Sequence, residues 1–119
     1  MQQMIRSATL LVTLMLATAS AYAHAFLDHA SPLVGSTVAT APSEVRMWFT
    51  QALEPRFSAA QLRSSAGAVL GNGTVDAADP KQLVIPVHAL PPGRYKVTWK
   101  VLSVDTHRTE GSFGFEVKP

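Results

Sequence analysis

The chain has 119 residues and no cysteine, and its formal net charge at pH 7 is +2. This length suits one domain rather than two, and without cysteine there are neither disulfide bridges nor thiolate ligands for zinc, iron–sulfur or type 1 copper centres. The charged residues are scattered singly instead of forming a basic run, which argues against binding to nucleic acid or to an anionic membrane surface.

The first 23 residues have the three parts of a secretory signal. A short segment with one positive charge precedes the apolar residues 8–19, and Ala21-Tyr22-Ala23 is a small-x-small cleavage site. An uncleaved membrane anchor is the alternative, but the apolar stretch is shorter than the ~20 residues that span a bilayer, and no stop-transfer pattern follows. We therefore expect a signal peptide over residues 1–23, export, and a mature domain of residues 24–119.

Proline and glycine divide the mature chain into short extended segments. Residues 25–30 form an apolar segment that ends before a Ser-Pro pair. Glu44–Phe49 alternates in character, which is typical of a strand with one buried face. Residues 59–63 and 68–70 are further candidates for short strands, and the Asn72-Gly73 pair suits a tight turn with positive φ.

The second half of the chain holds the clearest strand. After the apolar residues 83–87, in which Pro86 argues for an edge position or a bulge, Pro91-Pro92-Gly93 predicts a turn. In residues 95–101 every second residue is apolar, with Lys and Thr between them, as a half-buried strand requires. Residues 112–118 repeat this alternation and predict the last strand.

About seven short strands without a long amphipathic helix predict an all-β fold. Their spacing, with turn residues between them, is typical of an antiparallel sandwich or a small barrel. Helical turns around residues 34–38 or 76–81 are compatible with the pattern.

Cleavage after Ala23 would make His24 the first residue. An N-terminal histidine offers its α-amine and its imidazole Nδ1 to one ion, and no loop has to be ordered first. Because the free amine has a pKa of roughly 7.7–8, a metal must displace its proton at neutral pH, and among common divalent ions Cu(II) does so best. The alternative is that His24 merely follows the cleavage site, which is the commoner case for such a histidine taken alone.

A second candidate lies in residues 104–111, between the two clearest strands. In an extended stretch Asp105 and His107 project to the same side, because side chains two residues apart share a face. They could offer a carboxylate oxygen and an imidazole nitrogen to one ion, or Asp105 could cap a turn beside a solvated His107. With His24 they supply an amine, two imidazoles and a carboxylate, a set that suits Cu(II) better than Mg²⁺ or Ca²⁺ and leaves Zn²⁺ open.

These residues stand in segments that resemble the CopC-type periplasmic copper-binding domains of bacterial copper resistance systems. The resemblance covers residues 24–119, and its C-terminal part is the most specific. The matching segments are His24-Ala25-Phe26-Leu27, Ala30-Ser31-Pro32, Gly35-Ser36, residues 42–49, residues 93–99, Val104-Asp105-Thr106-His107 and Gly111-Ser112-Phe113.

The resemblance implies a seven-stranded, Ig-like Greek-key β-sandwich or barrel that binds one Cu(II) ion. The implied ligands are His24, through its amine and ring, together with Asp105 and His107. A periplasmic location, a monomeric state and a CopD-type inner-membrane copper transporter as partner are also implied.

The chain departs from some members of that family in two ways. A second site for Cu(I) in those members uses methionines, since soft thioethers suit that ion. Met47 is the one methionine outside the signal segment, and we expect it to pack in the core. A family position with an acidic residue falls near Gln51, which has no carboxylate to assist a copper site there. The sequence therefore predicts a Cu(II)-only member.

Other polar and aromatic residues are weaker candidates. We expect His29 and His88 to lie on the surface, and Trp48 and Trp99 to pack in the core or at its rim. Side chains that flank the predicted ligands could orient them without binding copper. They are Thr106, Arg108 and Glu110.

Three functions follow from these patterns. The first, on which we settle, is a non-enzymatic periplasmic copper carrier that sequesters Cu(II) and delivers it to the membrane partner. The second is a copper enzyme with a histidine brace that oxidises polysaccharides, although a chain this small has no obvious flat aromatic face. The third is a metal-free structural sandwich, since this fold hosts many unrelated functions.

Overall fold

The computed structural model describes residues 25–119, so the predicted signal peptide and His24 lie outside the described residues. The fold is all-β, as predicted, and one short 3₁₀ turn accompanies eight strands in the described part of the chain. The elements are β1 (Leu27–Ser31), β2 (Thr37–Val38), β3 (Glu44–Phe49), η1 (Pro55–Phe57), β4 (Ala59–Ser64), β5 (Val69–Val75), β6 (Gln82–Pro86), β7 (Gly93–Leu102) and β8 (Arg108–Val117).

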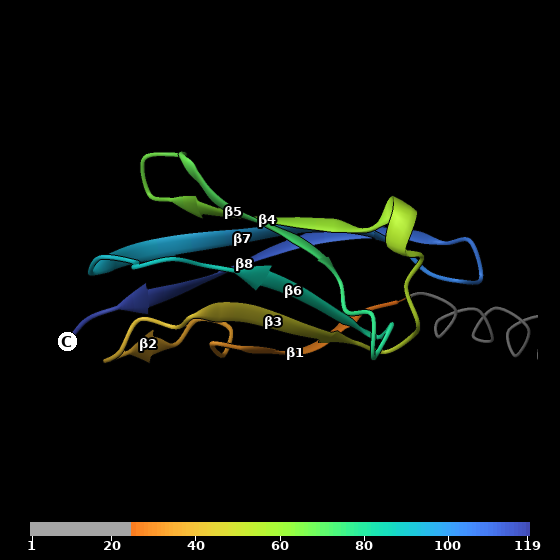
Figure 1. Ribbon diagram of the computed structural model, residues 1–119, viewed down its shortest axis with the longest axis horizontal. Coiled ribbons are helices and arrows are strands. Elements are labelled where there is room, and N and C mark those ends of the chain that lie inside the picture. The colour runs from red at the N-terminus through yellow and green to blue at the C-terminus, as the bar shows by residue number, and fades with distance from the viewer. Residues whose placement is uncertain (1–24) are drawn as a thin grey trace, which may run out of the picture.

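The strands form one curled sheet in the order β1-β3-β6-β5-β4-β7-β8-β2. Neighbouring strands are antiparallel except for β2 and β8, which are parallel. The curl brings β1, β3 and β6 into one layer and β4, β7 and β8 into the other (Figure 1). The result is the predicted Greek-key sandwich or barrel.

Strand β5 joins the two layers. It pairs with β4 through residues such as Gly73, opposite Ala60, and with β6 through Thr74, opposite Val84. The prediction of a tight turn at Asn72-Gly73 is wrong, because both residues lie inside β5. A Cβ on Gly73 would come within 2.7 Å of side-chain atoms of Leu83 and Ile85. The absence of a side chain at this position therefore lets β5 and β6 approach closely, and the residue does not form a turn.

The core lies between the two layers and consists of alternate residues of the long strands. In β3 every second side chain is buried, and the same alternation runs through β7 and the second half of β8, as the sequence predicts. Met47 is completely buried among these residues, which confirms its predicted packing role. The largest fully buried side chains include Met47, Leu53, Leu62, Leu83, Ile85, Val45, Val97 and Val101.

Several local predictions differ from the structure. Residues 34–38 form a turn that leads into β2 rather than a helical turn, and residues 76–81 form bends and a turn. Strand β6 lies inside the sheet between β3 and β5, not at its edge. Pro86 is tolerated because it is the last residue of β6, beyond the two residue pairs that join β6 to β5.

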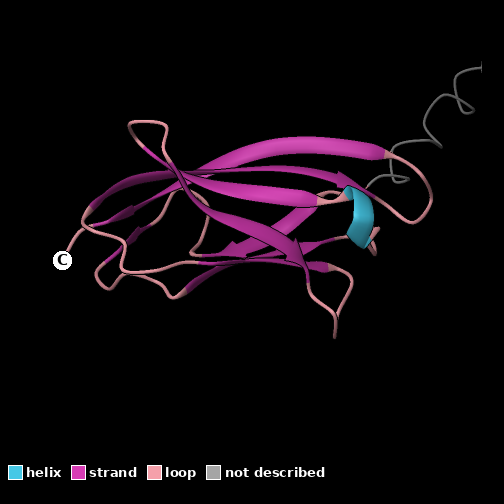
Figure 2. Ribbon diagram, turned by 45° about the horizontal axis from the view of Figure 1, so that its top comes forward, coloured by secondary structure: helices cyan, strands magenta, loops and turns pink. Residues whose placement is uncertain are grey.

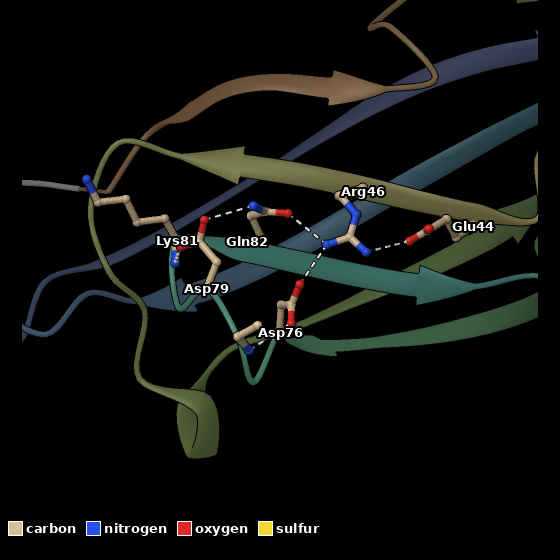
Figure 3. Close-up of polar contacts among 7 residues, drawn as sticks. Glu44, Arg46, Asp76, Asp79, Lys81 and Gln82 are labelled. Carbon is tan, nitrogen blue, oxygen red and sulfur yellow. Dashed lines mark hydrogen bonds and ion pairs between the residues drawn. The ribbon is translucent and has the colours of Figure 1, made fainter.

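A polar network covers the outer side of β3 and β6 (Figure 3). Arg46 donates hydrogen bonds to Asp76 Oδ2 (2.8 Å), Gln82 Oε1 (2.7 Å) and Glu44 Oε2 (3.0 Å). Gln82 in turn donates to Asp79 Oδ2 at 2.8 Å. These five residues, called the Arg46 network below, tie two strands to the loop that follows β5.

Segments that are distant in sequence lie together at one end of the sandwich. The turn between β7 and β8, the short η1 and the start of the described chain all lie at the right-hand end of Figures 1 and 2, opposite the C-terminus. The predicted ligands Asp105 and His107 belong to this end, because they lie between β7 and β8.

Candidate metal site at the β7–β8 turn

Residues 103–107 connect the two longest strands through a tight turn. The Thr106 N–H donates to the Ser103 carbonyl at 2.9 Å, and the Ser103 N–H donates to the His107 carbonyl at 3.0 Å. Thr106 has a φ of 73°, a left-handed conformation that is a true outlier for a β-branched residue. Such conformations persist only where the surrounding structure imposes them, and they concentrate at functional sites.

This turn brings the two predicted ligands together through a local conformation that differs from the one we expected. We expected an extended stretch in which Asp105 and His107 share a face, and the structure has a bend there instead. The two side chains still meet, since His107 Nδ1 lies 3.4 Å from Asp105 Oδ2. The turn, rather than strand alternation, therefore pairs the carboxylate with the imidazole.

The Asp105 carboxylate is held in its ionised form. The Ser103 hydroxyl donates a hydrogen bond to Oδ1. That bond is the main cause of the lowered pKa of Asp105; desolvation opposes it, and the hydrogen bond and the charge of His107 each add a smaller lowering effect. The side chains of Asp105 and His107 are 38% and 46% exposed, so an ion can reach both donors from solvent.

Neighbouring backbone fixes the position of the turn. The Val104 N–H donates to the Ala52 carbonyl at 3.1 Å, and the Glu54 N–H donates to the Leu102 carbonyl at 2.8 Å. Leu53 and Ser103 form an isolated antiparallel bridge between these two bonds. This turn (residues 103–107), called the ligand turn below, is thus attached to the segment that follows β3. Gln51, where we questioned carboxylate help, is half-buried one residue before Ala52.

The first described residue lies next to this turn. The Thr109 hydroxyl donates to the Ala25 carbonyl at 2.7 Å, and Ala25 is completely buried. Thr109 is the second residue of β8 and lies two positions after His107. The backbone at Ala25 is therefore anchored to β8 two positions after His107, by a hydrogen bond between residues that are 84 positions apart in the chain.

Residues 25–119 by themselves do not form a complete metal cage. In that range no three His, Cys, Asp or Glu residues are grouped closely enough to hold an ion. Asp105 and His107 supply one oxygen and one nitrogen donor, and a usual first shell for a transition metal needs at least one or two more. His24, the third predicted ligand, lies outside the described residues.

The remaining candidates lie away from the pair. His29 is exposed and stacks on Trp48, with ring centroids 4.4 Å apart. His88 is exposed in the connection between β6 and β7. Glu110 lies opposite Lys100 in the β7–β8 register, and its Oε2 is 3.9 Å from the Lys100 Nζ. That ion pair directs Glu110 to the outer face of the hairpin.

Sequence reasoning missed Ser103 and Thr109, the two hydroxyl residues that contact the ligand turn and the start of the described chain. A single serine or threonine near a predicted ligand has no spacing signature, so no sequence pattern distinguishes these two from other polar residues. Their role depends on contacts made through the folded backbone.

Residues 25–119 contain no helix long and apolar enough to cross a bilayer. Three apolar side chains at this end of the sandwich are exposed. Val104, within the turn, is 54% exposed, and Phe57 of η1 and Phe26 beside Ala25 are 58% and 48% exposed.

Comparison with protein families and curated proteins gives consistent results. The CopC domain matches residues 27–118. Protein YobA of Escherichia coli strain K12 is 35% identical over 117 residues, covering 96% of this chain and 94% of YobA. Copper resistance protein C of Pseudomonas syringae pv. tomato is 38% identical over 123 residues, covering 92% of this chain and 93% of that protein.

Solved structures agree with the sequence relatives. CopC from Methylosinus trichosporium OB3b superposes with a TM-score of 0.75 at 34% identity, covering 81% of this chain and 95% of that one. PcoC, a methionine-rich copper resistance protein from Escherichia coli, gives a TM-score of 0.71 at 34% identity, covering 81% of this chain and 100% of that one.

Proposed function

The chain belongs to the CopC family, which includes copper resistance proteins, and from this premise we propose that it binds one Cu(II) ion through His24, Asp105 and His107. In this proposal the signal peptide is removed after Ala23, the mature protein works in the periplasm as a monomer, and copper is its cargo.

The hydrogen bond between Thr109 and Ala25 is the observation that carries this proposal. Consecutive Cα atoms are about 3.8 Å apart, so a residue attached to Ala25 starts from a point anchored two positions beyond His107. The free amine and ring of an N-terminal histidine would then lie at the same end of the sandwich as Asp105 and His107. A distant Ala25 would have argued strongly against the site.

The chemistry of the donors supports Cu(II). An amine, two imidazoles and one carboxylate match the nitrogen and oxygen donors that Cu(II) prefers in tetragonal geometry. The Ser103 hydrogen bond keeps the pKa of Asp105 low, so the carboxylate needs no proton removed before it binds. Met47 is completely buried in the core, which supports the absence of a thioether site for Cu(I) on the described chain.

Carriage rather than catalysis is the role we propose. A carboxylate ligand favours Cu(II) over the reduced ion that oxygen chemistry requires. The protein would capture Cu(II), shield other periplasmic proteins from it and pass it to a CopD-type membrane transporter. Acid would release the ion, because protonation of the amine and imidazoles should weaken binding steeply below about pH 6.

The decisive experiment is a Cu(II) titration of the mature chain, residues 24–119, with electron paramagnetic resonance (EPR) of the complex. A matched control carries one additional glycine before His24, which keeps every side chain and displaces only the amine. We expect one-to-one binding with nitrogen hyperfine structure in the mature chain, and much weaker binding in the extended one.

The titration can also refute the proposed site. Equal and weak binding by the two samples would refute the terminal histidine as a ligand and leave a member of the family with another metal site or none. A separate assay with ascorbate and peroxide tests for catalysis, and turnover above that of free copper would contradict the carrier role.

A further inference from the structure

We propose that Ser103 is a positioning residue for copper, whose buried hydroxyl holds Asp105 and His107 in binding geometry before the ion arrives. This inference rests on the proposed function, since it assigns a role within the same site. It concerns a residue that binds no metal itself and that no sequence motif marks.

The Ser103 side chain is completely buried at the base of an otherwise exposed turn. Its hydroxyl donates to Asp105 Oδ1. The same oxygen accepts a hydrogen bond from the His107 N–H at 3.3 Å and lies 3.2 Å from the His107 carbonyl oxygen. One oxygen atom therefore contacts both predicted ligands, the first through its side chain and the second through its backbone.

The arrangement leaves one carboxylate oxygen beside the imidazole. The Ser103 hydroxyl donates to Oδ1 of the carboxylate and makes no bond to Oδ2. Oδ2 then faces the His107 ring, 3.4 Å from Nδ1. The hydroxyl thus restrains rotation of the carboxylate and favours Oδ2 as the oxygen presented together with the imidazole.

The base of this arrangement is rigid. Ser103 pairs with Leu53 across the sheet and receives the Thr106 N–H on its carbonyl. The left-handed Thr106 between the two ligands needs such support, because a β-branched residue adopts that conformation only under constraint. Partners that orient metal ligands in this way commonly change metal affinity by about 10–100-fold when they are removed.

Ser58 offers a matched control. It is the other buried serine among the described residues, with 6% exposure. Its hydroxyl accepts a hydrogen bond from the Leu102 N–H at 3.1 Å, one residue before Ser103. Ser58 therefore supports the same end of β7 without contacting Asp105 or His107. The substitutions S103A and S58A each remove one buried hydroxyl, and only the first removes a contact with the ligands.

The experiment measures Cu(II) affinity, the EPR spectrum and the melting temperature without metal for the mature wild type, S103A, S58A and S103T. We expect S103A to bind Cu(II) about 10–100-fold more weakly and to show an altered or mixed EPR spectrum. We expect S58A to keep the wild-type spectrum and an affinity within about threefold of wild type. S103T, which restores a hydroxyl, should recover the wild-type spectrum.

Each other outcome overturns the inference or its premise. Wild-type affinity and spectrum in S103A would show that the hydroxyl does not position the ligands. An equal loss in S103A and S58A would reduce Ser103 to general support of the fold. Failure of the wild type to bind Cu(II) would refute the proposed function and this inference with it, and the wild-type titration identifies that case separately.

Discussion

Two polar clusters on this molecule are built around an aspartate, and they treat its charge differently. In the Arg46 network, Asp76 receives a hydrogen bond from the Arg46 guanidinium at 2.8 Å and another from the Ala78 N–H at 2.9 Å. At the ligand turn, Asp105 is contacted by a serine hydroxyl and a histidine ring. In both places the pKa of the carboxyl lies below its ordinary value.

The difference lies in the partner. Arginine is always charged, and its planar donors match a carboxylate, so the charge of Asp76 is balanced within the protein. Serine carries no charge, and histidine is charged only when it is protonated. Asp105 is thus held ionised by groups that leave its negative charge available to a cation. The first cluster stabilises the fold, whereas the second has the properties that the proposed copper site requires.

The central pairs of the two clusters, Arg46–Asp76 and His107–Asp105, also differ in exposure. The side chains of Arg46 and Asp76 are each 26% exposed, whereas those of His107 and Asp105 are 46% and 38% exposed. The Arg46 network spans two strands and a loop (Figure 3). The ligand turn instead projects from the end of one hairpin, where an incoming ion can reach it.

Substitution of His107 should separate the two clusters most strongly. In H107A we expect Cu(II) affinity to fall by more than about 100-fold, since loss of a ligand should exceed loss of an orienting partner. The free energy of unfolding should change by no more than about 0.5 kcal/mol, because the side chain is half-exposed. H88A, which removes an exposed histidine from the β6–β7 connection, is the control, and binding lost equally in H88A would contradict the assignment.

Substitution of Arg46 should give the reverse result. R46M keeps most of the aliphatic stem and removes the hydrogen bonds to three partners. Partly exposed ion pairs contribute up to about 1 kcal/mol, and for a domain of this size we expect a fall in melting temperature on the order of 5 °C. Cu(II) affinity should stay at the wild-type value, and a coupled loss of copper binding would break the proposed division.

Acidification should remove the contribution of the Arg46–Asp76 ion pair to the stability of the fold. The pKa of Asp76 is lowered in the folded state from an ordinary 3.8 by the Ala78 N–H and by Arg46. The stabilisation is therefore fully present above about pH 4 and is lost as the pH falls through the lowered pKa. The difference in melting temperature between wild type and R46M should be constant at pH 5–7 and shrink below about pH 3.8. A difference that grew on acidification would have the wrong sign.

Thr106 should show the smallest effect. In T106G the left-handed φ of 73° becomes easy to adopt, and relief of that strain outweighs the greater freedom of glycine in the unfolded chain. We expect the free energy of unfolding to rise by up to about 1 kcal/mol, as measured by urea denaturation without metal. Thr106→Ala keeps a Cβ and is the control, and a T106G chain less stable than wild type would show that the conformation is not strained.

The accuracy of sequence reasoning varied along the chain in a physically understandable way. Glu44–Phe49 and residues 95–101 were predicted well, because alternation of burial is a local pattern. The turn predicted at Asn72-Gly73 was wrong, because a glycine after an asparagine suits either a turn or a strand that closely approaches its neighbours. Here Gly73 is required by the nearby side chains of Leu83 and Ile85, which lie on the neighbouring strand β6. Asp105 and His107 do lie side by side, in a turn rather than in the extended stretch that was expected, and their role as ligands stays a prediction.

The all-β class, most of the strands, the candidate ligands and the resemblance to CopC proteins can be read from the amino-acid sequence, because each depends on residues close together in the chain. The way β5 joins the layers, the contacts of Ser103 within the ligand turn and the position of Ala25 become visible only in the folded chain. These features depend on contacts such as the Thr109–Ala25 hydrogen bond, whose partners are 84 residues apart. No local pattern encodes such a contact, since it exists only once the whole sheet has curled and closed.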